Sequence, residues 1–320
     1  MFTYSQSLLS HDVVTTVRSD EKGRKIRDYH SSMPESRLSY VIVKDIAQDG
    51  SFDQAVVSDP PFEAVIHTAS PFHFNVTDAQ KDMLDPAING TTEILKAIKA
   101  KSPTVKKMVI TSSFAAIIND RKHPESYSEE IWNPVTMEEA LANPKVAYRA
   151  SKTFAEKAAW DFVRIERPNF QVATINPPLV IGPVLPYLVT LDTINTSNER
   201  IREMIQGKIQ EPLSPTDTFL WVDVRDVATA HIQAMELPGA SGKRFFVTKD
   251  HISNEDIADC IRKRFSELSS KLPAKSQTDK PAKRSFGFNN SRSVEVLGLK
   301  YRSLNESVTD TVKSLQILGA

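Results

Sequence analysis

Short apolar runs alternate with amphipathic stretches over the first 180 residues. The apolar runs are continuous rather than alternating with polar residues, which is typical of strands that are covered on both faces. Helical segments separate them, and this spacing favours βαβ units and a doubly wound parallel sheet, a Rossmann-like α/β fold. The expected strands are Asp12–Arg18, Leu38–Ile46, Ala64–Ser70, Val105–Ser113 and Phe170–Pro177; the expected helices are Glu21–Tyr29, Ile88–Ala100 and a long one that carries Tyr148 and Lys152.

The rhythm changes after Pro177. The proline-rich segment N-P-P-L-V-I-G-P-V-L-P predicts a structured loop rather than a strand or a helix. Beyond it the chain predicts a helix near 198–206, the segment F-L-W-V-D-V-R-D-V-A-T-A-H, a short strand R-F-F-V and a helix from Asn254. Such C-terminal additions often shape the substrate site of α/β enzymes.

Charge and cysteine content narrow the class of protein. Among 320 residues, 40 Lys and Arg balance 40 Asp and Glu, so no net field favours nucleic acid or an anionic membrane. The basic run from Lys271 to Lys283 is more simply a solvated loop than a binding patch. The single cysteine, Cys260, fits a reducing compartment, and the N-terminus resembles neither a signal peptide nor a membrane span. We therefore expect a cytoplasmic protein.

The candidate chemistry lies in two motifs, T-S-S at residues 111–113 and Y-R-A-S-K at residues 148–152. Tyr148 and Lys152 are four residues apart, so a helix places them on one face. A neighbouring ammonium lowers the pKa of a phenol, which suits proton transfer to or from an alcohol near neutral pH. A serine at the end of a strand can then bind the substrate oxygen. Because side chains on a strand alternate, only one of Ser112 and Ser113 can face the substrate.

With H-T-A-S-P-F and V-D-V-R-D-V-A-T-A-H also present, the chain resembles the extended short-chain dehydrogenase/reductases, and within them the dihydroflavonol-reductase-like branch that includes fungal methylglyoxal and ketone reductases. The resemblance runs from Asp12 to about Val312. It implies an NADP-dependent carbonyl reductase in which Ser113, favoured over Ser112, polarises the carbonyl. Tyr148 would donate the proton, while Lys152 would lower the tyrosine pKa and hold the nicotinamide ribose.

The resemblance also implies two parts and a set of cofactor contacts. Residues 1–180 would form the NADP-binding core, and residues 181–320 would form a mainly substrate-binding region that is partly interleaved with it. Arg18 ends the first strand, where an arginine accommodates the 2′-phosphate of NADP, although a solvated strand exit is the alternative. The further contacts implied are Lys22 on the phosphate, Asp45 and Ile46 beside the adenine, Thr68, Ala69 and Ser70 on the cofactor, Pro177 and Val180 on the nicotinamide, and Ser197 on a phosphate or ribose.

The small-molecule substrate is a carbonyl compound that the sequence does not specify. Phe72, Phe74, Tyr187 and the segment 183–196 are candidates for its pocket, with packing as the alternative. His67 and His73 have no acid or cysteine at metal-ligand spacing, so no metal is expected. The resemblance suggests a monomer or a weak homodimer.

One departure from the family concerns the start of the chain. The family begins with a strand, a G-x-x-G-x-x-G loop and a helix before the strand that ends here in Arg18, yet only 12 residues precede Val13 and none is glycine. We expect the first strand and the pyrophosphate-binding loop to be missing, either because the start is mis-called or because the protein is shortened. These 320 residues would then bind NADPH weakly or not at all.

Three functions therefore remain open. The first is an NADPH-dependent reductase of aldehydes or ketones. The second is a catalytically impaired homologue that acts as a binding or regulatory protein, and the third is an NAD-dependent epimerase or dehydratase. Arg18 argues against the third, because NAD-dependent members usually carry an acid at that position.

Overall fold

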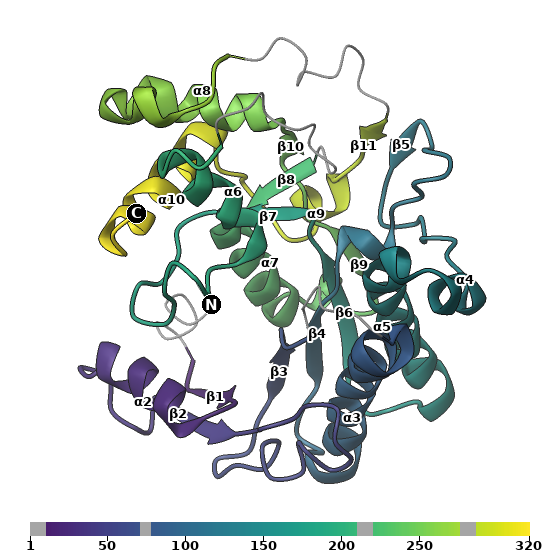
Figure 1. Cartoon of the computed structure of the whole chain (residues 1–320). Coiled ribbons are helices and arrows are strands. Elements are labelled where there is room, and N and C mark those ends of the chain that lie inside the picture. Colours follow the sequence, from purple (N-terminus) through teal and green to yellow (C-terminus); the bar gives the residue numbers. More distant parts are fainter. Residues whose placement is uncertain (1–10, 71–77, 210–219, 276–285) are drawn as a thin grey trace.

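The computed structural model describes residues 11–70, 78–209, 220–275 and 286–320. At its centre lies a four-stranded parallel sheet in the order β3–β4–β6–β9 (Figure 1). The strands span Ala64–His67 (β3), Lys107–Thr111 (β4), Gln171–Asn176 (β6) and Arg244–Phe246 (β9). The last strand comes from the C-terminal part of the chain, so the two parts are interleaved in this sheet.

Helices cover both faces of this sheet, as the continuous apolar runs predict. Helices α3 (Asp85–Lys101) and α5 (Pro144–Glu166) cover one face, where Met108, Ile110 and Val172 lie in a shared core. Helix α7 (Val224–Glu236) covers the other face, over Val109 and Ala173. Neighbouring strand residues therefore point to opposite cores, which is the alternation expected of a doubly wound sheet.

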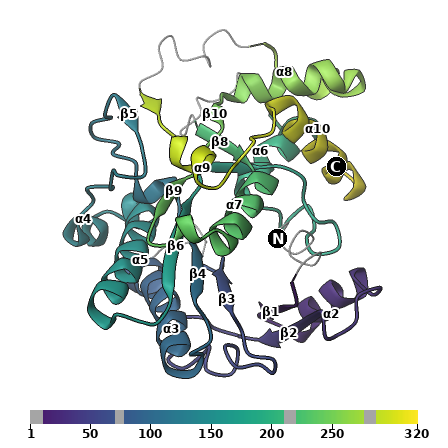
Figure 2. The same cartoon turned by 180° about the vertical axis from the view of Figure 1, so that it is seen from behind.

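A second, smaller parallel sheet pairs β1 (Val13–Val17) with β2 (Leu38–Ile42). It carries helix α2 (Asp20–Tyr29) and lies beyond the β3 edge of the large sheet, away from β9 (Figures 1 and 2). Among the described residues β1 pairs only with β2, and β3 only with β4. Within the described residues the two parallel sheets are therefore separate, and β1 and β3 are the strands between which the expected missing strand would lie.

The C-terminal part builds a third sheet from β7 (Leu179–Ile181), β8 (Leu220–Asp223) and β10 (Asp250–His251). Strand β7 corrects the prediction of a loop in the proline-rich segment. The prolines stand before and after these three residues, not among them, so each β7 residue keeps its backbone N–H. Parallel pairing with β8, some 40 residues later, then makes the strand. Local sequence patterns carry no signal of such a distant partner.

The remaining elements flank these sheets. Helices α6 (Thr196–Ile205), α8 (Asn254–Arg264) and α10 (Leu304–Ile317) enclose one apolar cluster around Trp221. The shorter elements are η1 (Gln80–Leu84), η2 (Phe114–Ala116), β5 (Ser126–Tyr127), α4 (Met137–Ala142), η3 (Pro238–Ala240), η4 (Ser266–Lys271), β11 (Gly287–Phe288) and α9 (Ser291–Glu295). Within the part of the chain that the structure describes, none of the helices has the length and apolar character needed to cross a membrane.

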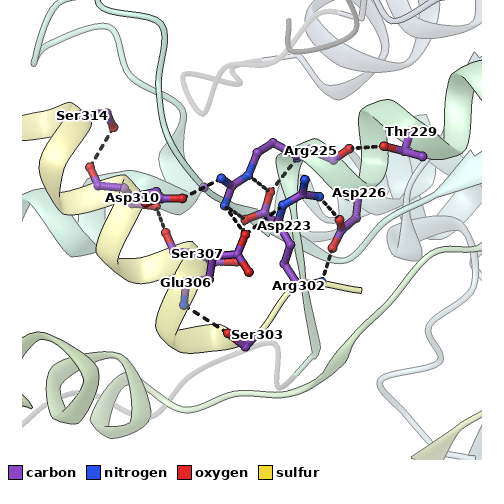
Figure 3. Close-up of polar contacts among 12 residues, drawn as sticks. Asp223, Arg225, Asp226, Thr229, Arg302, Ser303, Glu306, Ser307, Asp310 and Ser314 are labelled. Atoms are coloured by element: carbon purple, nitrogen blue, oxygen red, sulfur yellow. Dashed lines mark hydrogen bonds and ion pairs between the residues drawn. The ribbon is translucent and has the colours of Figure 1, made fainter. Parts of the chain in front are cut away.

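A buried ionic network joins helix α10 to the junction of β8 and α7 (Figure 3). The Asp223 carboxylate is fully buried and accepts two hydrogen bonds from the Arg225 guanidinium, at 2.9 and 2.8 Å. Arg225 also binds Asp310 on α10 at 2.6 Å, and Ser307 of the same helix donates to Asp223 at 2.5 Å. Because every buried charge here has a partner, the V-D-V-R-D motif fixes the C-terminal helix in place.

Candidate active site

Helix α5 presents the predicted site residues to the carboxyl edge of the large sheet. Tyr148 and Lys152 stand one turn apart on this 23-residue helix, as their spacing predicts. Ser113 follows the end of β4, and Ser70 follows the end of β3. Open α/β sheets bind ligands at this edge of the strands.

Tyr148 forms a side-chain hydrogen bond with Ser113. Its ring packs beside Ala79 and Met83, which lie at the π-helical turn that precedes α3. Burial raises the pKa of the Tyr148 phenol, and the hydrogen bond with Ser113 lowers it by less. Desolvation of the phenolate is the larger of these two effects, and the expectation that Lys152 lowers this pKa stays a prediction.

Lys152 instead donates to the Ser70 hydroxyl at 2.7 Å. Its ammonium lies 5.8 Å from the centre of the Tyr148 ring, a cation–π distance. Burial lowers the pKa of Lys152 to about 8, so the group is mostly an ammonium at pH 7. Lys152 therefore lies beside Tyr148 and in contact with the H-T-A-S segment.

The two candidate serines have different partners. Ser112 donates its hydroxyl to the buried carboxylate of Glu156 at 2.5 Å. Ser113 accepts from the Ala115 backbone N–H at 3.1 Å, which caps η2, and also bonds with Tyr148. The strand alternation thus leaves Ser113, the serine that the resemblance favours, on the Tyr148 side.

The small sheet carries the two predicted phosphate contacts. Arg18 follows β1 and Lys22 lies in the first turn of α2, and both are exposed. Neither side chain has an ion-pair partner among the described residues, although Asp20 and Glu21 beside them pair with Arg24 and Lys25. Two exposed cations at a helix N-terminus, without an ion-pair partner in the described part of the chain, suit a phosphate group. The residues present therefore fit the 2′-phosphate end of NADPH.

The predicted adenine contacts differ from one another. Asp45 is exposed and accepts from the Ala47 backbone N–H at 2.9 Å. Ile46 is buried in the core and packs under α3, where a Cβ on Gly90 would lie 2.9 Å from its side chain. The Ile46 side chain therefore packs in the core, and this contact accounts for its position.

The other cofactor residues lie on elements around the same edge. Thr68 is exposed, and Ala69 and Ser70 are half-buried, directly after β3. Pro177 is buried and its carbonyl accepts from Phe114 N–H at 2.8 Å, which ties the end of β6 to η2. Val180 lies within β7, not in a loop, and Ser197 lies in the first turn of α6.

Of the predicted pocket residues, Phe72 and Phe74, together with His73, lie outside the described residues. Tyr187 stacks on Tyr29 of α2, with ring centres 3.8 Å apart. It therefore joins the C-terminal part to the small sheet, and the packing interpretation accounts for this contact.

Sequence reasoning missed Glu156 in this region, and it considered His67 only as a metal ligand without a partner at the right spacing. Glu156 stands one turn after Lys152 on α5, and it is buried under donors from three strands. His67 is buried at the end of β3 with no hydrogen-bond partner for Nε2 among the residues described. Burial lowers its pKa to about 4. The spacing Tyr-x-x-x-Lys-x-x-x-Glu was the available signal for Glu156.

A doubly wound α/β sheet with Ser, Tyr and Lys at its carboxyl edge defines a nucleotide-dependent dehydrogenase or reductase fold. The model of the NAD dependent epimerase/dehydratase family matches residues 4–247, and the chain belongs to this family. This confirms the resemblance to the extended short-chain dehydrogenase/reductases.

Relatives and solved structures agree with this assignment. The chain is 48% identical to the ketoreductase azaE of Aspergillus niger over 95% of this chain and 90% of that protein. It is 42% identical to a putative NADPH-dependent methylglyoxal reductase, GRP2, of Candida albicans, over 97% and 92% of the two chains. The crystal structure of Gre2 from Candida albicans in complex with NADPH superimposes with a TM-score of 0.92 at 36% identity and covers 100% of this chain and 96% of that one.

Proposed function

We propose that the protein is an NADPH-dependent reductase that converts the carbonyl group of an aldehyde or ketone into an alcohol. The observation that carries this proposal is the Ser113–Tyr148 hydrogen bond beside Lys152 at the carboxyl edge of the sheet. The relatives named as ketoreductase and methylglyoxal reductase support it.

The cofactor, when bound, supplies the hydride. Arg18 and Lys22 would hold its 2′-phosphate, because they are exposed cations without ion-pair partners among the described residues. Lys152 would hold the nicotinamide ribose at the other end.

Tyr148 acts as the proton donor. Burial raises the pKa of its phenol, so the group is protonated at neutral pH and can give its proton to the carbonyl oxygen as that oxygen becomes negative. The Ser113 hydroxyl donates a hydrogen bond to the same oxygen and so stabilises the developing charge. Lys152 donates from its ammonium and keeps positive charge near the new alkoxide.

The surrounding residues shape the substrate site in this proposal. The C-terminal residues 181–320 mainly form the substrate pocket, and residues 1–180 mainly bind NADP(H). The protein is cytoplasmic, and a monomer or weak homodimer. The single cysteine and the balanced charge support the cytoplasmic location. The oligomeric state is measurable by light scattering.

The test is consumption of NADPH, followed at 340 nm as about 1 mM methylglyoxal or a simple ketone is added. We expect substrate-dependent oxidation of NADPH, much slower oxidation of NADH, and one alcohol formed per NADPH consumed. Binding of NADPH without turnover of any carbonyl would favour the impaired homologue. A preference for NADH would favour the epimerase or dehydratase chemistry instead.

A further inference from the structure

Helix α5 carries a third polar residue on the stripe of Tyr148 and Lys152. Glu156 follows Lys152 by four residues, so it lies on the same face, two turns and about 12 Å from Tyr148 along the axis. The Glu156 side chain is fully buried. A buried carboxylate costs several kcal/mol unless it is paired and hydrogen-bonded, so this position requires an explanation.

The Glu156 carboxylate accepts hydrogen bonds from every strand next to it. Ser112 after β4 donates to Oε2 at 2.5 Å, and Asn176 at the end of β6 donates to the same oxygen at 2.7 Å. Thr174 of β6 donates to Oε1 at 2.8 Å. Trp160, one turn further along α5, adds an N–H at 3.3 Å.

Arg244 on β9 supplies the opposite charge. Its Nε lies 2.7 Å from Glu156 Oε1, and its guanidinium stacks over the Trp132 ring at 3.6 Å. Nη1 donates to the backbone carbonyls of Glu129 and Ile131, and Nη2 donates to Glu156 Oε2 at 3.4 Å. Because Nε, Nη1 and Nη2 all have partners, the pair holds one orientation, and it joins α5 to β4, β6 and β9.

This network ends at the backbone of Ser113. Ser112 is its covalent neighbour, and the Asn176 amide also lies 3.3 Å from the Ser113 carbonyl oxygen. Glu156 is therefore linked to Ser113 through two separate side chains, while its own helix carries Tyr148. The distance between the Ser113 and Tyr148 hydroxyls depends on where α5 lies against these strands.

We propose that Glu156, paired with Arg244, is a positioning residue that fixes helix α5 against the end of β4 and thereby sets the Ser113–Tyr148 contact. The catalytic part of this inference rests on the proposed function. Glu156 does not touch the substrate, and it acts through Ser112 and Asn176. A misplacement of about 1 Å in a catalytic group can cost on the order of 100-fold in rate.

The first experiment is a double-mutant cycle with Ser112→Ala, Ser113→Ala and both together in the full chain. Ser112→Ala deletes one hydrogen bond and no charge, so we expect a loss of kcat of about 10-fold with nearly unchanged NADPH affinity. If Ser112 acts only by placing Ser113, the same change has no further effect when Ser113 is already alanine. An equal loss in both backgrounds, or no loss in either, overturns the proposal.

The same cycle can also be measured by NMR, without measuring turnover. The ¹³Cζ resonance of labelled Tyr148, identified by its absence in Tyr148→Phe, reports the hydrogen bond with Ser113. We expect Ser112→Ala to move it in the same direction as Ser113→Ala, with no additional movement in the double variant. An inactive parent that shows this pattern refutes the proposed function alone, whereas an active parent with an unmoved resonance refutes the positioning role alone.

Glu156→Gln tests the carboxylate directly, and Glu166→Gln on the same helix is its control. Glu166 is the last residue of α5, at the opposite end of the helix from Tyr148, and it pairs with Lys99 at 2.5 Å. We expect kcat to fall by roughly 100-fold in Glu156→Gln and to stay unchanged in Glu166→Gln. Parent-like kcat in folded Glu156→Gln contradicts the proposal, and the serine cycle decides if that variant does not fold.

Discussion

The catalytic end and the phosphate end of this protein are built in opposite ways. Around α5, buried groups are paired with one another, and the Glu156 carboxylate is held from three strands. Around β1 and α2, the candidate residues Arg18 and Lys22 are exposed and belong to a two-stranded sheet that does not pair with the large one in the described structure. Chemistry needs fixed geometry, whereas a phosphate can be bound by solvated cations that adjust to it.

The largest expected effect is that of Tyr148→Phe on kcat. The change keeps the ring and its packing beside Met83 but deletes the proton donor. General acid–base catalysis contributes about 10²–10⁴-fold, so we expect a loss of that order at unchanged NADPH affinity. Steady-state kinetics and NADPH fluorescence titration measure the two quantities. Parent-like turnover would mean that another group delivers the proton.

Acid is expected to destabilise the region of the large sheet. His231 donates from Nδ1 to the Val227 carbonyl and accepts from Thr111 at 2.6 Å, and burial lowers its pKa to about 4. The pKa of His67 is lowered to about 4 in the same way. The unfolded chain binds these protons near pH 6.5, so stability is lost as pH falls from 6.5 to 4, by up to about 3 kcal/mol for each histidine.

Urea unfolding measured between pH 7 and pH 4.5 checks this dependence. His231→Gln keeps a polar side chain but cannot titrate, so its stability should fall less steeply over the same range. An identical slope in the parent and the variant would show that the fold does not lower the pKa of His231.

Arg18→Ala should weaken NADPH binding and leave the chemical step intact. Hydrogen bonds to charged groups contribute roughly 1.5–3 kcal/mol, which corresponds to about 10- to 100-fold in Kd. Lys22→Ala should act in the same direction with a smaller effect, because a lysine makes no bidentate contact. NADH binding should stay constant in both variants. A matching loss for NADH would assign Arg18 a structural role instead.

The smallest expected difference between the two regions is in the rate of amide hydrogen exchange. An isolated two-stranded sheet is only marginally stable, so amides of β1 and β2 should exchange with solvent at least ~10-fold faster than those of β4 and β6. Hydrogen–deuterium exchange with and without NADPH measures this, and binding at Arg18 should slow exchange in β1. Equal protection of both sheets in the absence of cofactor would remove the contrast drawn above.

The sequence alone determined the parts that depend on local periodicity and spacing. The continuous apolar runs placed the strands β1, β4 and β6 within two residues of their observed bounds, because a buried strand must be apolar on both faces. The four-residue spacing placed Tyr148 and Lys152 on one face of α5, because a helix repeats every 3.6 residues.

Only the tertiary structure decided the features that depend on distant partners. Strand β7 exists because β8 lies beside it, and the pKa of Tyr148 rises because burial outweighs its hydrogen bond with Ser113. The separate roles of Ser112 and Ser113 follow from Glu156, which is more than 40 residues away in the chain. Desolvation, strand pairing and buried charge pairing depend on which segments contact one another in the folded chain. Composition and local sequence pattern do not reveal those contacts.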